Sequence, residues 1–392
     1  MTVARPLTVF HSRSEWLSQT ETWLFNQVRY LPPNVESHIV CESTANLDRF
    51  PVDNLHSVGD LSAWRRLALR AYGYRHYGKR IELSVAHRHQ VMQHNKAQVL
   101  HSHFGFTGWG DCWIAKRLGL KHVVTFYGYD IGFPQQDPQW EKRYRDMFKL
   151  VDRVLCEGPF MGQRIIDLGC PPEKMQVHHL GIRIDEIPFK PRTWDGEGPL
   201  RILMAASFRQ KKGLPNAFEA VGLLQDKVPV EVTVIGDAAP DAEAQAEKQK
   251  IMAAVEKHRL GPKVNFMGYQ PFDVMTEQAY RHHVFLSPSI HADDGDSEGG
   301  APVSIIEMAA SGMMVVSTTH CDIPEVIHHG KSGLLAAEGD VDGLVTHLTW
   351  LVDHPERWEG MAQEARRHVE EQFDVHPQGQ RLAETYEALV RT

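Results

Sequence analysis

The sequence predicts an α/β protein made of two doubly wound, Rossmann-like domains that face each other across a cleft. Three observations lead to this prediction. Short apolar segments rich in Val alternate with longer helical segments in both halves of the chain. A length of 392 residues is enough for two domains of ordinary size. A composition of 42% hydrophobic and 23% charged residues is typical of globular proteins and excludes disordered, collagen-like and disulfide-scaffold chains.

The first half of the chain contains five segments with the pattern of buried strands. They are apolar and bounded by polar residues or glycine, at 6–10, 36–42, 97–103, 122–126 and 153–157. Helical patterns lie between them, at 19–31, 62–95, 109–118 and 138–149. Strands that alternate with helices form parallel sheets through right-handed crossovers, so we expect one parallel sheet here.

The second half repeats this alternation. Strands are predicted at 200–206, 230–236, 264–268, 283–289 and 314–318, and helices at 213–224, 241–259, 272–280 and 302–311. The tail from 355 is helical, with a break within 370–377. The polar stretch 188–200, which contains Pro and Gly, is the best boundary. We therefore expect an N-terminal domain at 1–190, a C-terminal domain at 191–371 and a helix at 372–392 that packs back on the first domain.

A basic loop follows the strand predicted at 200–206. Arg209, Lys211 and Lys212 come just past the strand, and Gly213 opens the next helix. Cations beside the free backbone N–H groups of a helix N-terminus form a site for an anion. A solvated basic loop is the alternative. We favour phosphate binding, because ligands of open parallel sheets bind beyond the carboxyl ends of the strands.

The segment 287–312 has the features of a second binding loop. Gly299 and Gly300 permit a close approach of backbone to a ligand, and Pro302 suits the first position of a helix. Glu307 then lies in an otherwise apolar helix, where a carboxylate is costly without donors. Ribose hydroxyls would serve as those donors, and a solvated helix edge is the alternative.

The sequence gives no metal-binding pattern that we accept. Asp294 begins a match to a calcium loop, but the position of the required glutamate is Ile305. The pair Asp294 and Asp296 is a short match that an acidic loop meets by chance. Five cysteines are scattered without a C-x-x-C pair, which argues against a cysteine zinc site. His101 and His103 alternate at a strand end without a third ligand, so we expect no metal.

Taken together, these segments resemble the retaining glycosyltransferases of family 4, which have the GT-B fold. SFRQKKG (207–213) is similar to the phosphate loop of that family, EGGAPVSIIEMAASGMMVVST (298–318) to its double-glutamate donor motif, and IPEVIHHGKSGLL (323–335) to the segment that follows. The N-terminal half is similar more loosely, in SQTETWLFNQV (18–28), HSHFG (101–105), TFYGYD (125–130), CEGPFM (156–161) and LGCPPEK (168–174). The similarity is closest to the exopolysaccharide branch, of the colanic-acid type.

This resemblance implies a metal-independent hexosyltransferase that takes a hexose from a nucleotide sugar, with UDP-hexose favoured, and retains the anomeric configuration. The acceptor would be a saccharide or a lipid-linked oligosaccharide in exopolysaccharide synthesis, bound by the N-terminal domain, with the donor on the C-terminal domain. The implied donor-binding residues are Ser207, Arg209, Lys212, Gly268, Tyr269, Glu298, Gly299, Gly300, Ala301, Pro302, Val303 and Glu307. The implied acceptor-binding residues are Glu21, His103, Gly105 and Tyr127. The implied catalytic residues are Arg209, Lys212, Glu298, Tyr127 and Asp130.

Three positions depart from the family pattern. Glu298 and Glu307 are one position farther apart than the two glutamates of the family, and Gly299 stands at the place of the first. We expect Glu298 to swing in. Ser207 stands where the family has its phosphate-binding arginine, and Arg209 is the substitute we expect. Tyr127 stands where the family usually has a His before Gly. We expect Tyr127 to supply the backbone or hydroxyl contact that this His makes in the family.

Two alternatives stay open at this point: a nucleotide-sugar epimerase of the same architecture, and a non-catalytic nucleotide-sugar binder. Neither a signal-like apolar run at the start nor a membrane-spanning run is present, so we expect a cytoplasmic protein. The segment 62–80 combines Arg, Lys and aromatic residues, which predicts either peripheral contact with an anionic membrane at its inner face or a solvated helix. The acidic net charge of −8 argues against nucleic-acid binding.

Overall fold

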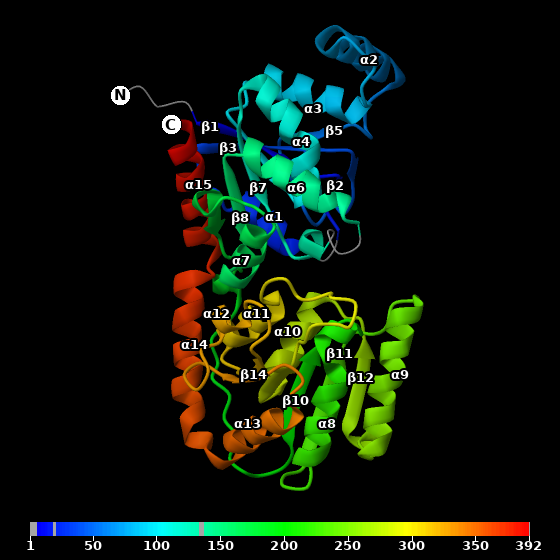
Figure 1. Ribbon diagram of the computed structural model, residues 1–392. Coiled ribbons are helices and arrows are strands. Elements are labelled where there is room, and N and C mark those ends of the chain that lie inside the picture. Colours follow the sequence, from blue (N-terminus) through cyan, green and yellow to red (C-terminus); the bar gives the residue numbers. More distant parts are fainter. Residues whose placement is uncertain (1–5, 19–20, 133–136, 392) are drawn as a thin grey trace, which may run out of the picture. The chain divides into compact units, whose positions relative to one another are not determined.

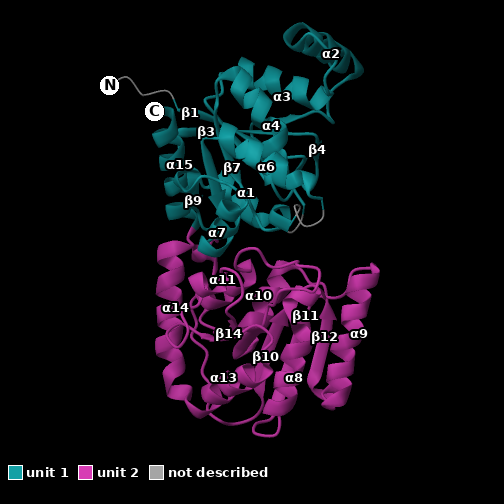
Figure 2. Cartoon of the chain, viewed as in Figure 1, with its two compact units in different colours: residues 1–181, 375–392 teal, residues 182–374 magenta. Residues whose placement is uncertain are grey.

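The computed structural model describes residues 6–18, 21–132 and 137–391, which divide into two compact units. Unit 1 comprises Met1–Gly181 and Val375–Thr392, and unit 2 comprises Ile182–Asp374 (Figure 2). Each unit has its own parallel sheet covered by helices (Figure 1). The predicted α/β class with two doubly wound domains is therefore confirmed.

Unit 1 is built on a seven-stranded sheet in the order β5-β3-β1-β6-β7-β8-β9, in which all paired neighbours run parallel. The strands are β1 (Leu7–Ser12), β3 (Val35–Cys41), β5 (Leu55–Ser57), β6 (Val99–His103), β7 (Lys121–Thr125), β8 (Arg153–Cys156) and β9 (Met175–Val177). A separate short pair is formed by β2 (Glu15–Trp16) and β4 (Ser43–Thr44). The order of the strands reverses between β1 and β6, which is where sheets of this kind bind ligands.

Helices cover both faces of this sheet because successive strand residues point to opposite sides. The helices are α1 (Thr22–Arg29), α2 (Ala63–Tyr77), α3 (Leu83–His94), α4 (Gly105–Leu118), α6 (Gln139–Leu150), α7 (Pro159–Asp167) and α15 (Val375–Arg391). Val9 packs in one core cluster with Tyr386 of α15. Its neighbour Phe10 packs in another cluster with Ile114 of α4.

Unit 2 has a six-stranded parallel sheet in the order β12-β11-β10-β13-β14-β15. The strands are β10 (Leu200–Ala205), β11 (Val230–Ile235), β12 (Val264–Gly268), β13 (Val284–Ser287), β14 (Met314–Thr318) and β15 (Leu334–Ala336). The helices are α8 (Leu214–Leu224), α9 (Ala242–Lys257), α10 (Phe272–Arg281), α11 (Val303–Ser311), α12 (Ile323–Val326), α13 (Val341–Asp353) and α14 (Trp358–Gln372). The order reverses between β10 and β13, so their following loops meet at the ligand edge.

The core of unit 2 lies on both faces of its sheet. Ile202 belongs to a cluster with Phe218 of α8 and Leu348 of α13. Leu203, one residue on, belongs to a cluster with Ile306 of α11 and Val369 of α14. All six side chains are buried, so the sheet is held between two apolar layers.

Some elements differ from the sequence prediction. The single helix expected at 62–95 is wrong: α2 ends at Gly78, whose φ of 68° is left-handed, and α3 begins at Leu83. The short strands β5, β9 and β15 were not predicted. The first two residues of the helix expected at 19–31 lie outside the described residues.

The boundaries between the units also differ from those expected at 190 and 371. The segment after Gly181 belongs to unit 2 because the Ile182 N–H donates to the Phe373 carbonyl and the Lys190 N–H donates to the Ser311 carbonyl. At the other end, α15 belongs to unit 1 because Tyr386 packs under its sheet.

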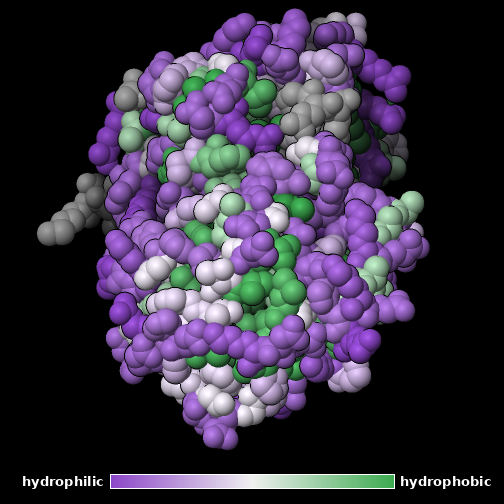
Figure 3. Space-filling model, turned by 60° about the horizontal axis from the view of Figure 1, so that its bottom comes forward, coloured by the Kyte–Doolittle hydropathy of each residue, from purple (hydrophilic) through white to green (hydrophobic). Residues whose placement is uncertain are grey.

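Among the described residues, no helix is both long and apolar enough to cross a membrane. Hydrophilic side chains dominate the face shown in Figure 3, with a smaller hydrophobic patch near its centre. In α2, three large apolar side chains are exposed: Trp64 is 82% exposed, Leu67 55% and Tyr74 65%. Leu67 lies three residues after Trp64, and Tyr74 lies seven residues after Leu67. These spacings place the three side chains on one side of α2, where they form an apolar stripe.

Candidate active site

The phosphate-loop segment of unit 2 is fixed by a close backbone contact. The loop after β10 ends in the 3-10 turn Gln210–Lys212, and Gly213 follows with a φ of 62°. A Cβ on Gly213 would lie 1.9 Å from the carbonyl oxygen of Pro288, which follows β13. Only glycine fits there, so the loops after β10 and β13 lie against each other at the point where the strand order reverses.

Lys212 and Glu298 join these two loops. Lys212 Nζ lies 2.7 Å from Glu298 Oε2, and the Ser289 hydroxyl donates to Glu298 Oε1 at 2.8 Å. The Glu298 side chain is 7% exposed and that of Lys212 is 21% exposed. Burial raises the pKa of the Glu298 carboxyl, but the charge and hydrogen bond of Lys212 outweigh it, so the pKa lies below its ordinary value. The Glu298 carboxyl is therefore ionised at neutral pH.

The predicted donor segment runs into the N-terminus of α11. Gly299 is buried with a φ of 78°, Gly300 is buried, and α11 begins at Val303 after the non-helical Pro302. The first backbone N–H groups of a helix have no partner inside the helix, and its dipole favours an anion there. The segment thus offers donors to a phosphate.

Glu307 lies on α11 with its side chain half-buried. Burial raises the pKa of Glu307 to about 7, and the charge of Arg183 offsets this only in part. Among the described residues, this carboxylate has no hydrogen-bond or ion-pair partner. Hydroxyl donors of a ligand would stabilise this half-buried carboxylate.

Other residues predicted for the donor site lie apart from the Lys212–Glu298 pair. Arg209 is paired with Asp241 at 2.7 Å and Glu243 at 2.8 Å, near the start of α9. Ser207 is half-buried between β10 and this turn. Tyr269 is 63% exposed and donates its hydroxyl to the Asp237 carbonyl at 2.8 Å. Arg209 would have to leave two carboxylates to reach a phosphate.

In unit 1, the predicted Tyr127 and His103 lie in a buried hydrogen-bond network. The Tyr127 hydroxyl donates to Gln27 Oε1 at 2.8 Å and lies 2.6 Å from His103 Nδ1. His103 Nε2 lies 3.1 Å from His11 Nδ1. Burial raises the pKa of Tyr127 well above its ordinary value, so the phenol stays protonated. The ring also contacts Trp23 of α1, with 4.4 Å between centroids.

Asp130 anchors the loop after β7. Its carboxylate accepts the N–H of Gly105 at 2.6 Å and the N–H of Tyr127 at 3.1 Å, and the side chain is fully buried. Burial raises the pKa of Asp130 to about 6, although both amides oppose the shift. Phe104, which precedes Gly105, has a φ of 74°, a strained value for a bulky residue. Asp130 therefore holds the backbone at Gly105, after β6, against the backbone at Tyr127, after β7.

Glu21 lies at the start of α1, close to the end of β1. It accepts from the Arg13 guanidinium and from the Ser18 N–H at 3.1 Å. The guanidinium of Arg13 also lies over the Phe104 ring, 4.1 Å from its centroid. Arg13 thus joins the loops after β1 and β6, where the strand order of unit 1 reverses.

Two groups of side chains have the donors of a metal site. His11, His101 and His103 lie together in unit 1, all buried. His291, His320 and Cys321 lie together in unit 2. The third histidine of the first group, His11, has no signal in the sequence. It lies on a different strand, β1, which pairs with β6 so that His11 is opposite His101.

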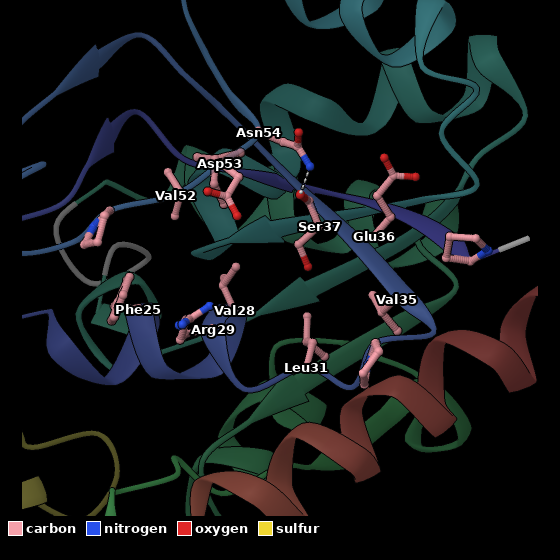
Figure 4. A pocket seen from close by; sticks show the side chains of 14 residues that line it. Phe25, Val28, Arg29, Leu31, Val35, Glu36, Ser37, Val52, Asp53 and Asn54 are labelled. Atoms are coloured by element: carbon pink, nitrogen blue, oxygen red, sulfur yellow. Dashed lines mark hydrogen bonds between the residues drawn. The ribbon is translucent and has the colours of Figure 1, made fainter.

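A cavity of about 370 Å³ lies elsewhere in unit 1, between α1 and β3 (Figure 4). Phe25 and Val28 line it from α1, and Val35 and Ser37 from β3. The Asn54 amide donates to the Ser37 carbonyl at its wall. No residue predicted for the acceptor site lines it, so we leave it outside the candidate site.

Sequence reasoning did not single out Gln27, Arg13, Ser289, His320 or Glu338 as parts of these sites. Each contacts a predicted residue or its loop, Arg13 and Ser289 from nearby in the sequence and the others across the fold. Gln27 lies within the family-like segment 18–28 and Arg13 lies shortly before it, which was the available signal. His320 and Glu338 follow the ends of β14 and β15, a position that topology alone marks.

Comparison with known proteins agrees with this geometry. The profile described as Glycosyltransferase Family 4 matches residues 20–186, and the profile described as Glycosyl transferases group 1 matches residues 187–368. The amylovoran biosynthesis glycosyltransferase AmsK of Erwinia amylovora is 34% identical over 296 residues, which cover 75% of this chain and 70% of AmsK. The chain belongs to the family 4 glycosyltransferases.

Within this family the relatives indicate the exopolysaccharide branch. WcaL of Escherichia coli K12, whose name assigns it to colanic acid biosynthesis, is 29% identical over 341 residues, covering 86% of this chain and 80% of WcaL. The expected glycosyltransferase of exopolysaccharide biosynthesis is thereby confirmed, and the epimerase and non-catalytic alternatives are not favoured.

Solved structures support the GT-B fold. The crystal structure of Anabaena HepE in complex with UDP has a TM-score of 0.74 and 15% identity, covering 97% of this chain and 100% of that chain. The apo lipopolysaccharide outer core galactosyltransferase WaaB has a TM-score of 0.69 and 15% identity, covering 97% of this chain and 99% of that one. At such identities the likeness shows the fold alone.

Proposed function

We propose that unit 2 binds a UDP-hexose and that the enzyme transfers the hexose, with retention, to a saccharide or lipid-linked acceptor bound by unit 1. The observation that carries this proposal is the buried Lys212–Glu298 pair at the reversal of strand order, next to the N-terminus of α11. The pair and the helix end offer a cation, a carboxylate and backbone donors at one edge of the sheet. These are the groups that a sugar diphosphate needs.

The reaction breaks the bond between the anomeric carbon and a diphosphate oxygen, and forms a bond from that carbon to an acceptor oxygen. The acceptor hydroxyl gives its proton to the leaving phosphate oxygen on the same face. Negative charge thus develops on the phosphate, where Lys212 and the N–H groups that begin α11 stabilise it without rearranging. In this proposal these groups take the place of a metal on the diphosphate.

Two further residues would hold the nucleotide and the sugar. Glu307 would accept hydrogen bonds from the ribose hydroxyls, which are donors for its half-buried carboxylate. Glu298 would contact hexose hydroxyls while Lys212 turns to the phosphate. UDP is the favoured nucleotide because structures of HepE contain UDP and UDP-glucose.

Transfer assays of two variants test this assignment. Loss of one preorganised donor costs on the order of 100-fold or more in kcat, so Lys212→Ala should lose at least that much. Glu307→Ala should lose affinity for the UDP-sugar. Lys227→Ala is the matched control, since Lys227 lies in the same unit and pairs with Asp353 on the surface. Undiminished transfer by the Lys212 variant would contradict the proposal.

We also propose that α2 holds the enzyme at the inner face of an anionic membrane. Trp64, Leu67 and Tyr74 form its exposed apolar stripe, and Arg65 and Arg70 are exposed beside them. Aromatic and aliphatic side chains enter the lipid interface, while arginines attract anionic head groups at about 1 kcal/mol each. Such contact would bring unit 1 to a lipid-linked acceptor.

Vesicle flotation tests this contact. With phosphatidylglycerol-containing vesicles we expect the protein to float, and to sink when Arg65, Arg70 and Arg75 are all replaced by Glu. Arg66 is left in place because it donates to the Gly59 and Leu61 carbonyls. The matched control replaces exposed basic residues of α6 in the same unit by Glu: Lys142, Arg145 and Lys149. Equal flotation of both variants would contradict the proposal.

A further inference from the structure

Beside the donor segment, three side chains of unit 2 bring two imidazoles and a thiol together. One ligand atom each from His291, His320 and Cys321 lies within 4.8 Å of the other two. Cys321 Sγ is 3.1 Å from His320 Nε2. His320 and Cys321 are buried, whereas His291 is exposed, so the group can be reached from solvent.

The topology of the sheet explains how these residues meet. His291 follows β13, His320 and Cys321 follow β14, and Glu338 follows β15. These are three adjacent parallel strands, so their carboxyl ends lie at one edge. The sequence alone shows no metal pattern, because the ligands come from separate loops.

Glu338 orients both imidazoles in the same way. Its carboxylate lies 2.8 Å from His320 Nδ1 and 2.9 Å from His291 Nδ1. A carboxylate on the Nδ1–H of a histidine fixes the ring and leaves the ε nitrogen as the ligand atom, the arrangement found behind histidines that bind zinc. Here one carboxylate serves two rings.

The thiol is held in a conformation that a cysteine does not take freely. Cys321 has a φ of 46°, in the left-handed region. The Gly299 N–H and the Ser297 hydroxyl make hydrogen bonds with its sulfur. Burial nevertheless raises the pKa of the Cys321 thiol to about 12, so the thiol is protonated in the metal-free protein and would release its proton to bind a metal.

We propose that His291, His320 and Cys321 bind a zinc-type transition metal, with Glu338 as the carboxylate behind both histidines. Two imidazoles and a thiolate are donors that Zn²⁺ prefers, and three protein ligands leave a fourth position open. A thiolate and the adjacent carboxylate balance the charge of a divalent ion. The site contacts the backbone of Glu298 and Gly299 but uses neither Lys212 nor the N–H groups that begin α11, and the inference does not depend on the identity of the donor.

Metal at this site would be linked to the donor segment. His320 Nε2 now accepts the backbone N–H of Glu298 at 3.1 Å. The lone pair of that nitrogen serves either this N–H or a metal. Binding of the metal therefore changes the backbone contact of Glu298, the residue that pairs with Lys212.

The test uses the full chain, stripped with a chelator and then equilibrated with Zn²⁺ or Co²⁺ alone. We expect about one metal ion per chain after desalting, and a thiolate-to-Co²⁺ charge-transfer absorption in the cobalt form. Cys321→Ser should abolish that absorption. His291→Ala, at an exposed position that leaves the core intact, should weaken Zn²⁺ binding about tenfold or more.

Cys170→Ser is the matched control, because Cys170 is a buried cysteine of unit 1 outside both histidine groups. It should bind metal as the wild type does. Absence of bound metal would overturn the proposal. Metal that binds without the thiolate absorption and is lost in His103→Ala would also overturn it, by assigning the ion to the group in unit 1. Nucleotide binding measured on the same samples reports separately on the donor site.

Discussion

Replacement of Lys212 by Met removes the cation from a carboxylate that is 7% exposed. A hydrogen bond to a charged group contributes about 1.5–3 kcal/mol, and removal of one partner of a buried pair costs about 3–5 kcal/mol. The Lys212 side chain is 21% exposed, and Ser289 still donates to Glu298 in the variant. We therefore expect a loss of about 2 kcal/mol near neutral pH, at the lower end of these ranges.

The loss should depend on pH in a defined direction. In the wild type the folded-state pKa of Glu298 is lowered, so the pair stabilises the protein above the ordinary carboxyl pKa and this stability is lost as the pH falls. In the Lys212→Met variant, burial acts without that cation and raises the pKa of Glu298. As the pH falls, protonation of Glu298 removes an unpaired charge from the variant but breaks the ion pair of the wild type. The difference between their free energies of unfolding therefore becomes smaller.

Scanning calorimetry at about pH 7.5 and about pH 4.5 measures this difference. For a unit of this size about 2 kcal/mol corresponds to a Tm lower by about 4–8 °C at the higher pH. Lys227→Met is the control: its surface pair with Asp353 is worth less than about 1 kcal/mol at either pH. A loss no larger than that of the control, or a loss equal at both pH values, would refute the reasoning.

Three further substitutions follow from the geometry. Glu307→Gln should raise Tm above about pH 8, where the Glu307 carboxylate with its raised pKa is ionised, and leave Tm unchanged at about pH 5. The affinity of this variant for UDP should fall tenfold or more. An unchanged affinity in a titration calorimeter would count against the ribose contact. Tyr127→Phe should cost about 1–3 kcal/mol in urea unfolding because Gln27 and His103 lose a buried partner, and wild-type stability would argue against the network. Gly213→Ala should lower Tm and donor affinity together, since its Cβ would lie 1.9 Å from a carbonyl oxygen; a variant that melts and binds like the wild type would show that the loop contact is not needed.

The sequence predicts the sheets well because buried parallel strands are short apolar runs. Strands β10, β12 and β14 were placed within a residue of their ends. The helix expected at 62–95 was wrong because Gly78, with a left-handed φ of 68°, ends α2, and a second helix begins at Leu83. Strand β15, of three residues, is too short for a periodic signal and forms only by pairing with β14.

Site residues that belong to a motif within one loop could be predicted from the sequence. The residues of other loops that contact them could not. Lys212 and Glu298 were both singled out, but their pairing depends on the reversal of strand order between β10 and β13. The two carboxylates that hold Arg209 come from α9 and have no sequence signal beyond ordinary acidic residues. The meeting of His320, Cys321 and Glu338 at one sheet edge likewise follows from strand order alone.

The central claim is that unit 2 is a nucleotide-sugar site built on Lys212 and Glu307. Equilibrium binding of UDP, GDP and ADP to the wild type and to Lys212→Ala and Glu307→Ala tests it most directly. The account predicts that UDP binds tightest and that each variant weakens it about tenfold or more, with the fold intact by circular dichroism. Absence of binding by all three nucleotides, or UDP binding equal in the wild type and both variants, would contradict it.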